Sequence, residues 1–134
     1  MVRISFELKN YQFSYESLTG VKKPLKNQKQ IQIAHFLDKF DYQILNDTEI
    51  KVKFHFRLVI APKVGEYSFD GECIMESPEQ EKIRHLLKNY RAKLKHAVNR
   101  FLLKECYFYA EKLALSENLY FPPVQEILDV YRIE

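Results

Sequence analysis

The chain is 134 residues long, which predicts one domain with its own hydrophobic core. Hydrophobic residues make up 46% and charged residues 29%, which excludes a disordered chain, and only 3 glycines and 5 prolines exclude a collagen-like or low-complexity one. No apolar run approaches the ~20 residues of a membrane-spanning helix, and the first residues do not resemble a signal peptide. We therefore expect a cytoplasmic protein without membrane insertion. The net charge of +3 is too small to indicate nucleic-acid binding by itself.

The N-terminal segment alternates apolar and polar residues, which predicts a strand with one apolar face. The alternation over residues 2–8 resumes after a slip of one residue, so we expect a β-bulge near residues 9–10. Beyond the slip, Tyr11, Phe13 and Tyr15 continue the same apolar face.

The pattern of strands continues to about residue 76. Residues 17–29 show no period and predict a loop, and residues 30–45 predict a strand with an irregular middle. A turn at residues 45–48 leads into the clearest strand of the chain, over residues 50–60. A hairpin with Pro and Gly then leads to a return strand over residues 67–75.

The second half of the chain has the period of helices. Ser77 and Pro78 are typical of a helix start, and no Pro or Gly interrupts residues 80–115. One unbroken helix of that length would be about 54 Å long, which is longer than a domain of this size is wide. We therefore expect that it kinks near Asn89 or Asn99, or packs against another subunit.

Two overlapping apolar stripes on the long helix are expected to face the sheet. They consist of Ile83, Leu87, Tyr90, Leu94, Ala97 and Phe101, and then of Val98, Leu102, Cys106, Tyr109, Ala110 and Leu113. A short helix over residues 124–131 ends the chain. We predict a single α+β domain over residues 1–134, with an antiparallel sheet of about four strands within 2–76, followed by a long helix and a short C-terminal helix within 78–131.

Motifs for catalysis, metal binding or cofactor binding do not stand out. The four histidines have no metal-ligand spacing, and there is no glycine-rich phosphate loop or nucleophile elbow. We therefore predict that the protein is not an enzyme and has no catalytic residues, metal site or cofactor. Two cysteines are too few for a disulfide framework or a zinc site, so we expect Cys73 and Cys106 to be buried thiols.

Basic residues crowd the stretch over residues 82–104. They indicate either an anionic partner such as nucleic acid or a solvated face of the helix. We favour the solvated face, because a nucleic-acid site needs stacking aromatics and only Tyr90, part of the expected apolar stripe, lies nearby.

The aromatic residues point to a binding function. Nine Tyr and ten Phe residues are more than one small core needs, and exposed aromatics bind diverse apolar segments without requiring particular hydrogen bonds. The candidate contact residues are Tyr11, Phe13, Tyr15, Phe36, Phe40, Tyr42, Tyr107, Phe108, Tyr120 and Phe121.

Four short motifs follow one another along the chain. They are Gln43-Ile44-Leu45-Asn46-Asp47 before Ile50-Lys51-Val52-Lys53-Phe54, then Gly65-Glu66 followed by Phe69, Tyr109-Ala110-Glu111, and Pro123-Val124 with Leu128. Together with the order of elements, they resemble the SecB family of export chaperones over residues 2–131. The resemblance implies a SecB-like fold and a dimer or tetramer formed through the sheet edge and the long helix. The chain departs from that family in its basic charge and in a short loop over residues 117–123.

The aromatics and the resemblance together predict a holdase, which is a chaperone that binds unfolded or partly folded polypeptides and prevents their aggregation. The resemblance adds a possible role in protein export. Two alternatives stay open. One is a nucleic-acid-associated protein that uses the basic helix over residues 82–104, and the other is a scaffold for one folded partner, such as a toxin–antitoxin component.

Overall fold

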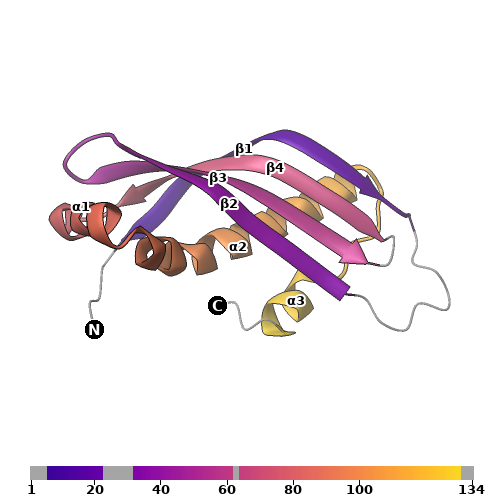
Figure 1. The fold of residues 1–134 in the computed structure, drawn as a ribbon. Coiled ribbons are helices and arrows are strands. Elements are labelled where there is room, and N and C mark those ends of the chain that lie inside the picture. The colour runs from indigo at the N-terminus through magenta and orange to yellow at the C-terminus, as the bar shows by residue number, and fades with distance from the viewer. Residues whose placement is uncertain (1–5, 23–31, 62–63, 131–134) are drawn as a thin grey trace.

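The computed structural model describes residues 6–22, 32–61 and 64–130 (Figure 1). The elements are β1 (Glu7–Gly20), β2 (Gln32–Ile44), β3 (Glu49–Ala61), β4 (Gly65–Glu76), α1 (Gln80–Asn89), α2 (Arg91–Ser116) and α3 (Val124–Val130). The strands form one antiparallel sheet in the order β1-β4-β3-β2, so β1 and β2 are its edges. The predicted α+β class, with four strands before the helices, is confirmed.

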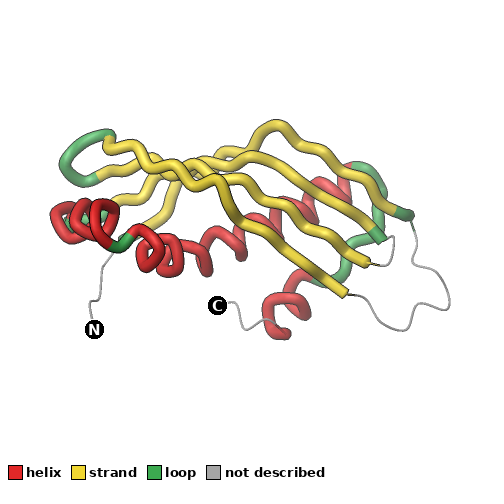
Figure 2. Tube along the Cα trace, viewed as in Figure 1, coloured by secondary structure: helices red, strands yellow, loops and turns green. Residues whose placement is uncertain are grey.

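All three helices lie on the same side of the sheet, and α2 runs diagonally beneath it (Figures 1 and 2). An antiparallel sheet covered in this way has one apolar face and one solvated face. In the part of the chain that the structure describes, no helix is long and apolar enough to cross a membrane.

The central strands β3 and β4 follow the predicted alternation closely. Their buried side chains all face the helices, and they are Ile50, Val52, Phe54, Phe56, Leu58, Ile60, Tyr67, Phe69, Cys73 and Met75. Gly71 continues this face, because its partner Phe54 lays its ring over the glycine. A Cβ atom at Gly71 would come within 2.4 Å of two ring atoms of Phe54, so only glycine fits this position.

The edge strands are irregular. β1 shifts register within residues 9–12 and again within residues 14–17, and β2 shifts register within residues 38–41. At each shift one residue has the left-handed backbone conformation, with φ between 53° and 56°; these residues are Asn10, Tyr15 and Lys39. Each shift is a β-bulge that inserts one extra residue opposite the neighbouring central strand.

The bulge within residues 9–12 and the bulge within residues 38–41 correspond to sequence predictions. The bulge within residues 14–17 corrects the predicted direction of Tyr15. The slip near residues 9–10 and the irregular middle of residues 30–45 are confirmed. The bulge within residues 14–17 was not predicted, and it turns Tyr15 out to solvent, with 85% of its surface exposed. β1 also continues to Gly20, so the loop prediction for residues 17–29 was wrong at its start.

Several other predictions fall on residues outside the described ranges. They concern the strand over residues 2–5, part of the predicted loop at 23–29, and the end of the last helix at 131.

The helical half of the chain breaks at Tyr90, which separates α1 from α2. Tyr90 has φ −141° and ψ 49°, which is not helical, so the predicted kink near Asn89 is confirmed. The hydroxyl of Ser77 accepts a hydrogen bond from the backbone N of Glu79 at 3.0 Å, which supports the predicted helix start. α2 keeps 26 residues and is about 39 Å long.

The buried side chains of α2 recur every four residues. They include Leu94, Val98, Leu102, Cys106, Ala110 and Ala114. Because four residues turn the helix by about 400°, this row drifts by about 40° at each step as α2 crosses the sheet. Tyr90, Ala97 and Phe101 fall off the row and are exposed, so the first predicted stripe was wrong at these positions.

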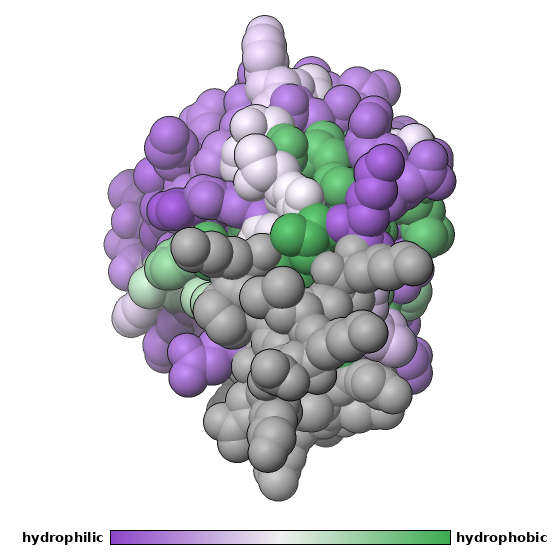
Figure 3. Space-filling view, turned by 90° about the vertical axis from the view of Figure 1, so that its right-hand side faces the viewer, coloured by the Kyte–Doolittle hydropathy of each residue, from purple (hydrophilic) through white to green (hydrophobic). Residues whose placement is uncertain are grey.

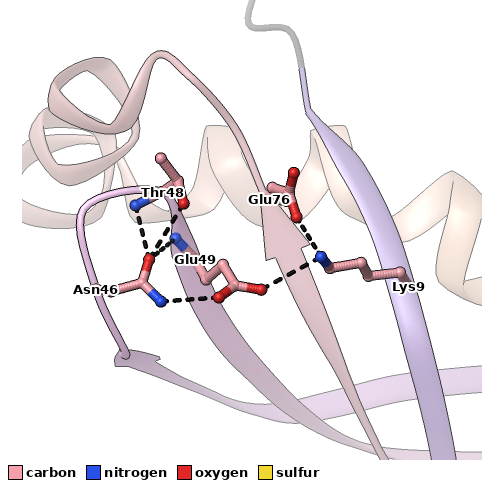
Figure 4. A network of polar contacts seen from close by, with 5 residues as sticks. All are labelled: Lys9, Asn46, Thr48, Glu49 and Glu76. Carbon is pink, nitrogen blue, oxygen red and sulfur yellow. Dashed lines mark hydrogen bonds and ion pairs between the residues drawn. The ribbon is translucent and has the colours of Figure 1, made fainter.

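One polar network ties the start of β1 to the neighbouring strands (Figure 4). Lys9 forms ion pairs with Glu76 and, at 3.3 Å, with Glu49. The side-chain oxygen of Asn46 accepts hydrogen bonds from the backbone N of Thr48 and of Glu49, both at 2.9 Å. Hydrogen bonds from Asn46 and Lys9 lower the pKa of Glu49, and those to Glu76 and Glu49 raise the pKa of Lys9.

Candidate functional site

The two cysteines are buried, as predicted, one on β4 and one on α2. Burial raises the pKa of Cys73 to about 12 and the pKa of Cys106 well above its ordinary value. Neither thiol is therefore a nucleophile at neutral pH. Within residues 6–22, 32–61 and 64–130, no group of three His, Cys, Asp or Glu side chains could hold a metal ion.

Aromatic side chains gather along the side of α2 that faces β1. We call this surface the β1 flank, and it consists of Phe6, Tyr11, Phe13, Phe101 and Tyr109. Phe13 stacks on Tyr109 with ring centroids 4.1 Å apart, and Phe6 meets the edge of Phe101 at 5.6 Å. These contacts bring aromatic residues that are far apart in the sequence together in two groups along the same side of α2.

Acidic groups border the β1 flank. Glu16 accepts a hydrogen bond from the hydroxyl of Tyr109. Burial and this bond raise the pKa of Tyr109 to about 12. Burial, with a smaller effect of the negative charge of Glu105, raises the pKa of Tyr11. Both tyrosines therefore stay neutral, and the charges that act on their hydroxyl groups are the carboxylates of Glu16 and Glu105.

A second surface lies along the opposite side of α2, beside β2. We call it the β2 flank, and it consists of Leu37, Phe40, Tyr42, Arg91 and Lys95. The ammonium of Lys95 lies 5.1 Å from the ring centroid of Phe40, and the guanidinium of Arg91 lies 5.8 Å from that of Tyr42. These are cation–π contacts, so the aromatic rings of this flank are bordered by positive charge.

A cavity of about 300 Å³ opens between β2 and α2. It is lined by His35, Leu37, Ala92, Lys95, His96 and Asn99. At its inner end, Nδ1 of His35 lies 2.5 Å from the hydroxyl oxygen of Tyr107. Burial lowers the pKa of His35, so its imidazole is neutral at pH 7.

The structure brings four of the ten predicted contact residues into the flanks, namely Tyr11, Phe13, Phe40 and Tyr42. Their role in binding stays a prediction. Three others lie outside the flanks, one of them buried and two partly buried. Tyr107 is completely buried, Phe121 packs edge-on against Tyr67 at 5.4 Å, and the backbone N of Tyr120 donates to the carbonyl of Val21 at 2.7 Å. Tyr107 therefore supports the β2 flank from beneath instead of offering a surface.

Phe121 and Tyr120 close the end of the sheet at which β1 ends and β4 begins. Figure 3 looks onto this end, where hydrophilic residues border a narrow hydrophobic strip.

The remaining three predicted residues are exposed but lie on separate surfaces. Tyr15 projects from a bulge at the β1 edge. Phe36 is 49% exposed on the open face of the sheet, where Arg57 lies 5.8 Å from its ring centroid. Phe108 is 41% exposed and lies on the solvent side of α2. The structure therefore does not join these residues into one site.

Three aromatic members of the flanks were not among the predicted contacts, and neither were Leu37, Arg91 and Lys95 of the β2 flank. Phe6, Phe101 and Tyr109 were not predicted contacts, because Phe101 and Tyr109 fit the apolar stripes expected to face the sheet. The sequence pattern that could have revealed this surface is the four-residue spacing of Phe101, Glu105 and Tyr109. This spacing places these three α2 residues on one side of the helix.

The exposed charged residues of α2 are all basic. Its exposed cations are Arg91, Lys93, Lys95, Arg100, Lys104 and Lys112. Its two acids, Glu105 and Glu111, are both partly buried. Tyr90, expected to face the core, is 48% exposed with the ammonium of Lys93 5.0 Å from its ring centroid. An aromatic does therefore stand beside the basic surface.

The fold and the flanks define an α+β protein with aromatic surfaces on both sides of a long helix. No protein-family model matches the chain, and no curated protein matches it. Among solved structures, it is similar to a SecB-like chaperone of Mycobacterium tuberculosis in complex with a ChAD peptide from the HigA1 antitoxin. The two chains are 11% identical with a TM-score of 0.49, over 88% of this chain and 83% of that one. This similarity is too distant to support a functional argument, so function must be inferred from the flanks.

Proposed function

We propose that the protein is a holdase that binds extended, non-native polypeptide segments along the β1 and β2 flanks. The observation that supports this most is the pairing of each aromatic flank with an edge strand. β1 and β2 each have a sheet neighbour on one side only among the described strands. An extended segment can add to such an edge through its main chain, while its apolar side chains enter the flank. Each Å² of apolar area buried contributes about 25 cal/mol before entropy costs.

Two flanks on one chain allow one client to bind twice, which raises the overall affinity without new kinds of contact. We further propose that the protein forms a dimer or tetramer, which would multiply this effect. Phe108 and Leu115 support association, because both are exposed and lie seven residues apart on α2, outside the two flanks. At that spacing they lie within about 20° of one another and form a stripe that a second helix can cover.

Light scattering on a sizing column tests the proposal directly. The protein is run with and without a carboxymethylated, permanently unfolded client, at moderate and at high salt. We expect a complex at both salts, because burial of apolar surface is not screened by ions. A particle that never carries the client would overturn the holdase. Saturable binding to one folded partner, without binding to unfolded chains, would favour the scaffold instead.

A matched pair of variants locates the binding surface. Phe101→Ala removes an aromatic ring from the β1 flank, and Phe36→Ala removes one from the open face of the sheet. The two rings are almost equally exposed, at 48% and 49%. We expect client binding to weaken for Phe101→Ala only. Equal losses would show that any exposed ring serves, and an effect of Phe36→Ala alone would move the site to the open face.

A second candidate function is binding of nucleic acid along α2. The observation that favours it is that every exposed charged residue of α2 is basic. Binding of this kind releases counterions, so log affinity for DNA or RNA would fall steeply and linearly with log salt. Anisotropy of labelled oligonucleotides over a salt series measures this slope. A flat or absent signal removes this candidate.

A further inference from the structure

We propose that the β2 flank selects polypeptide segments in which an acidic residue stands next to an apolar or aromatic one. This inference rests on the proposed holdase function and adds the class of segment that one of its surfaces prefers.

The first support is the opposite charge of the two flanks. Arg91 and Lys95 lie over aromatic rings in the β2 flank, whereas the charges that border the β1 flank at Tyr109 and Tyr11 belong to Glu16 and Glu105. Complementary charge beside an apolar contact selects between segments that are equally apolar. The β2 flank is therefore the one that fits acidic segments.

The second support is that the cations of the β2 flank are not neutralised within the protein. Neither Arg91 nor Lys95 forms an ion pair with any residue in the described ranges. The first turn of α2 contains no acidic residue, and no side chain caps it. Helix N-termini normally favour negative charge, so cations here oppose the helix dipole. A departure from a local rule that no ion pair offsets is typical of a binding site.

The third support is the hydroxyl of Tyr42. Its oxygen is buried and has no hydrogen-bond partner among the described residues, which is unfavourable for a polar group. The guanidinium that lies over its ring belongs to Arg91, an exposed side chain that can rotate aside. A carboxylate entering there accepts a hydrogen bond from the Tyr42 hydroxyl and pairs with Arg91 at the same time.

The fourth support is the cavity beside these charges. Its volume of about 300 Å³ lies at the lower end of the range for ligand pockets, which is suited to one side chain. Lys95 borders both this cavity and the ring of Phe40. When an acidic residue of the bound segment pairs with Arg91, the apolar residue next to it on the segment therefore lies within reach of the cavity.

Anisotropy of two labelled peptides tests the inference. Both are extended and carry the same aromatic and aliphatic residues, but one has Glu beside each aromatic and the other has Lys. We expect the wild-type protein to bind the Glu peptide roughly three- to ten-fold more tightly at low salt. The double variant Arg91→Glu/Lys95→Glu should reverse this preference. The double variant Arg91→Gln/Lys95→Gln should abolish the preference. It also provides the test if Arg91→Glu/Lys95→Glu does not fold.

The control variant is Lys93→Glu/Lys112→Glu, which changes the net charge by the same amount on the same helix but outside the β2 flank. It should keep the preference for the Glu peptide. Loss of the preference in this control, or equal binding of both peptides by the wild type, overturns the inference and leaves the holdase standing. Failure to bind either peptide, together with failure to carry the unfolded client, overturns the holdase itself.

Discussion

The two central strands and the two edge strands of the sheet differ in regularity. β3 and β4 pair with each other without a register shift, and their apolar residues alternate into the core. β1 carries two bulges and β2 carries one. A central strand has partners on both sides that hold its register, whereas an edge strand can bend and insert residues at lower cost.

The bulges explain why aromatic flanks exist at all. At each bulge the residue after the left-handed one points to the helix side of the sheet; these residues are Tyr11, Glu16 and Phe40. In a regular strand these positions would face the open side. The irregularity of the edges therefore supplies the side chains that line α2, and the regular centre supplies the core beneath them.

The largest effect is expected from Gly71→Ala in the central pair. A methyl group at Gly71 would overlap the ring of Phe54, so we expect a loss of roughly 1–3 kcal/mol in the free energy of unfolding. Gly20→Ala at the end of β1 is the control, because its added carbon meets a flexible leucine side chain, Leu119, at 3.1 Å. Urea titration measures both. Equal losses at the two sites would contradict the distinction between centre and edge.

A smaller effect, of opposite sign at edge and centre, is expected from glycine substitutions. Lys39 has φ 54° in the β2 bulge, where glycine is free of strain, so Lys39→Gly should stabilise the protein by ~0.5–1 kcal/mol. Lys51→Gly in regular β3 should destabilise it by a similar amount. The same urea titration detects both shifts, and a destabilised Lys39→Gly variant would show that the bulge is not strained.

The pH dependence of stability should carry a contribution from His35 on β2. Burial lowers its folded-state pKa below the ordinary value of 6.5, so the unfolded state binds more protons. Stability should therefore fall as pH drops below about 6.5, until the folded-state pKa is passed. We expect His35→Gln to show a flatter profile in thermal unfolding between pH 7 and pH 5. An unchanged slope would assign the effect to other groups.

The smallest effect is expected from the exposed network at the start of β1. The pKa of Glu49 is lowered in the folded state, so its contribution is present above its ordinary value of about 4.5 and is lost as pH falls through the folded-state value. Glu49→Gln should reduce the acid sensitivity of unfolding slightly. Glu81→Gln on exposed α1 is the matched control, and acid titration followed by circular dichroism compares the two. A larger change for Glu81→Gln would show that the contacts of Glu49 do not contribute to the acid sensitivity of unfolding.

The fold was predictable where burial alone sets the pattern. β3 alternates because one face is wholly buried, and the first bulge is visible because the alternation slips by one residue. The bulge at Tyr15 could not be seen, because an aromatic at that position continues the apolar period equally well. Its outward direction depends on the left-handed backbone at that residue, which no periodicity records.

The candidate site was predictable only in part, because it depends on where α2 crosses the sheet. Phe40 and Tyr42 could be identified as aromatics in an irregular strand. The exposed position of Phe101 could not be predicted. Phe101 fits a 3.6-residue stripe but falls off the four-residue row of buried side chains, and only the course of the helix decides which of these two patterns faces the core. The difference in charge between the flanks has the same origin. Because α2 crosses the sheet diagonally, Lys95 lies on the β2 side of the helix and Glu105 on the β1 side.

The three bulges also affect the tendency of the protein to aggregate through its strand edges. Open strand edges are templates for repeated pairing between chains. Within the described residues, β1 and β2 each have one unpaired edge, which is the kind of edge through which fibres form. A strand interrupted by a left-handed residue cannot keep its hydrogen-bonding groups in line over a long stretch. Asn10, Tyr15 and Lys39 therefore limit any added strand to short segments, which favours reversible capture over permanent stacking.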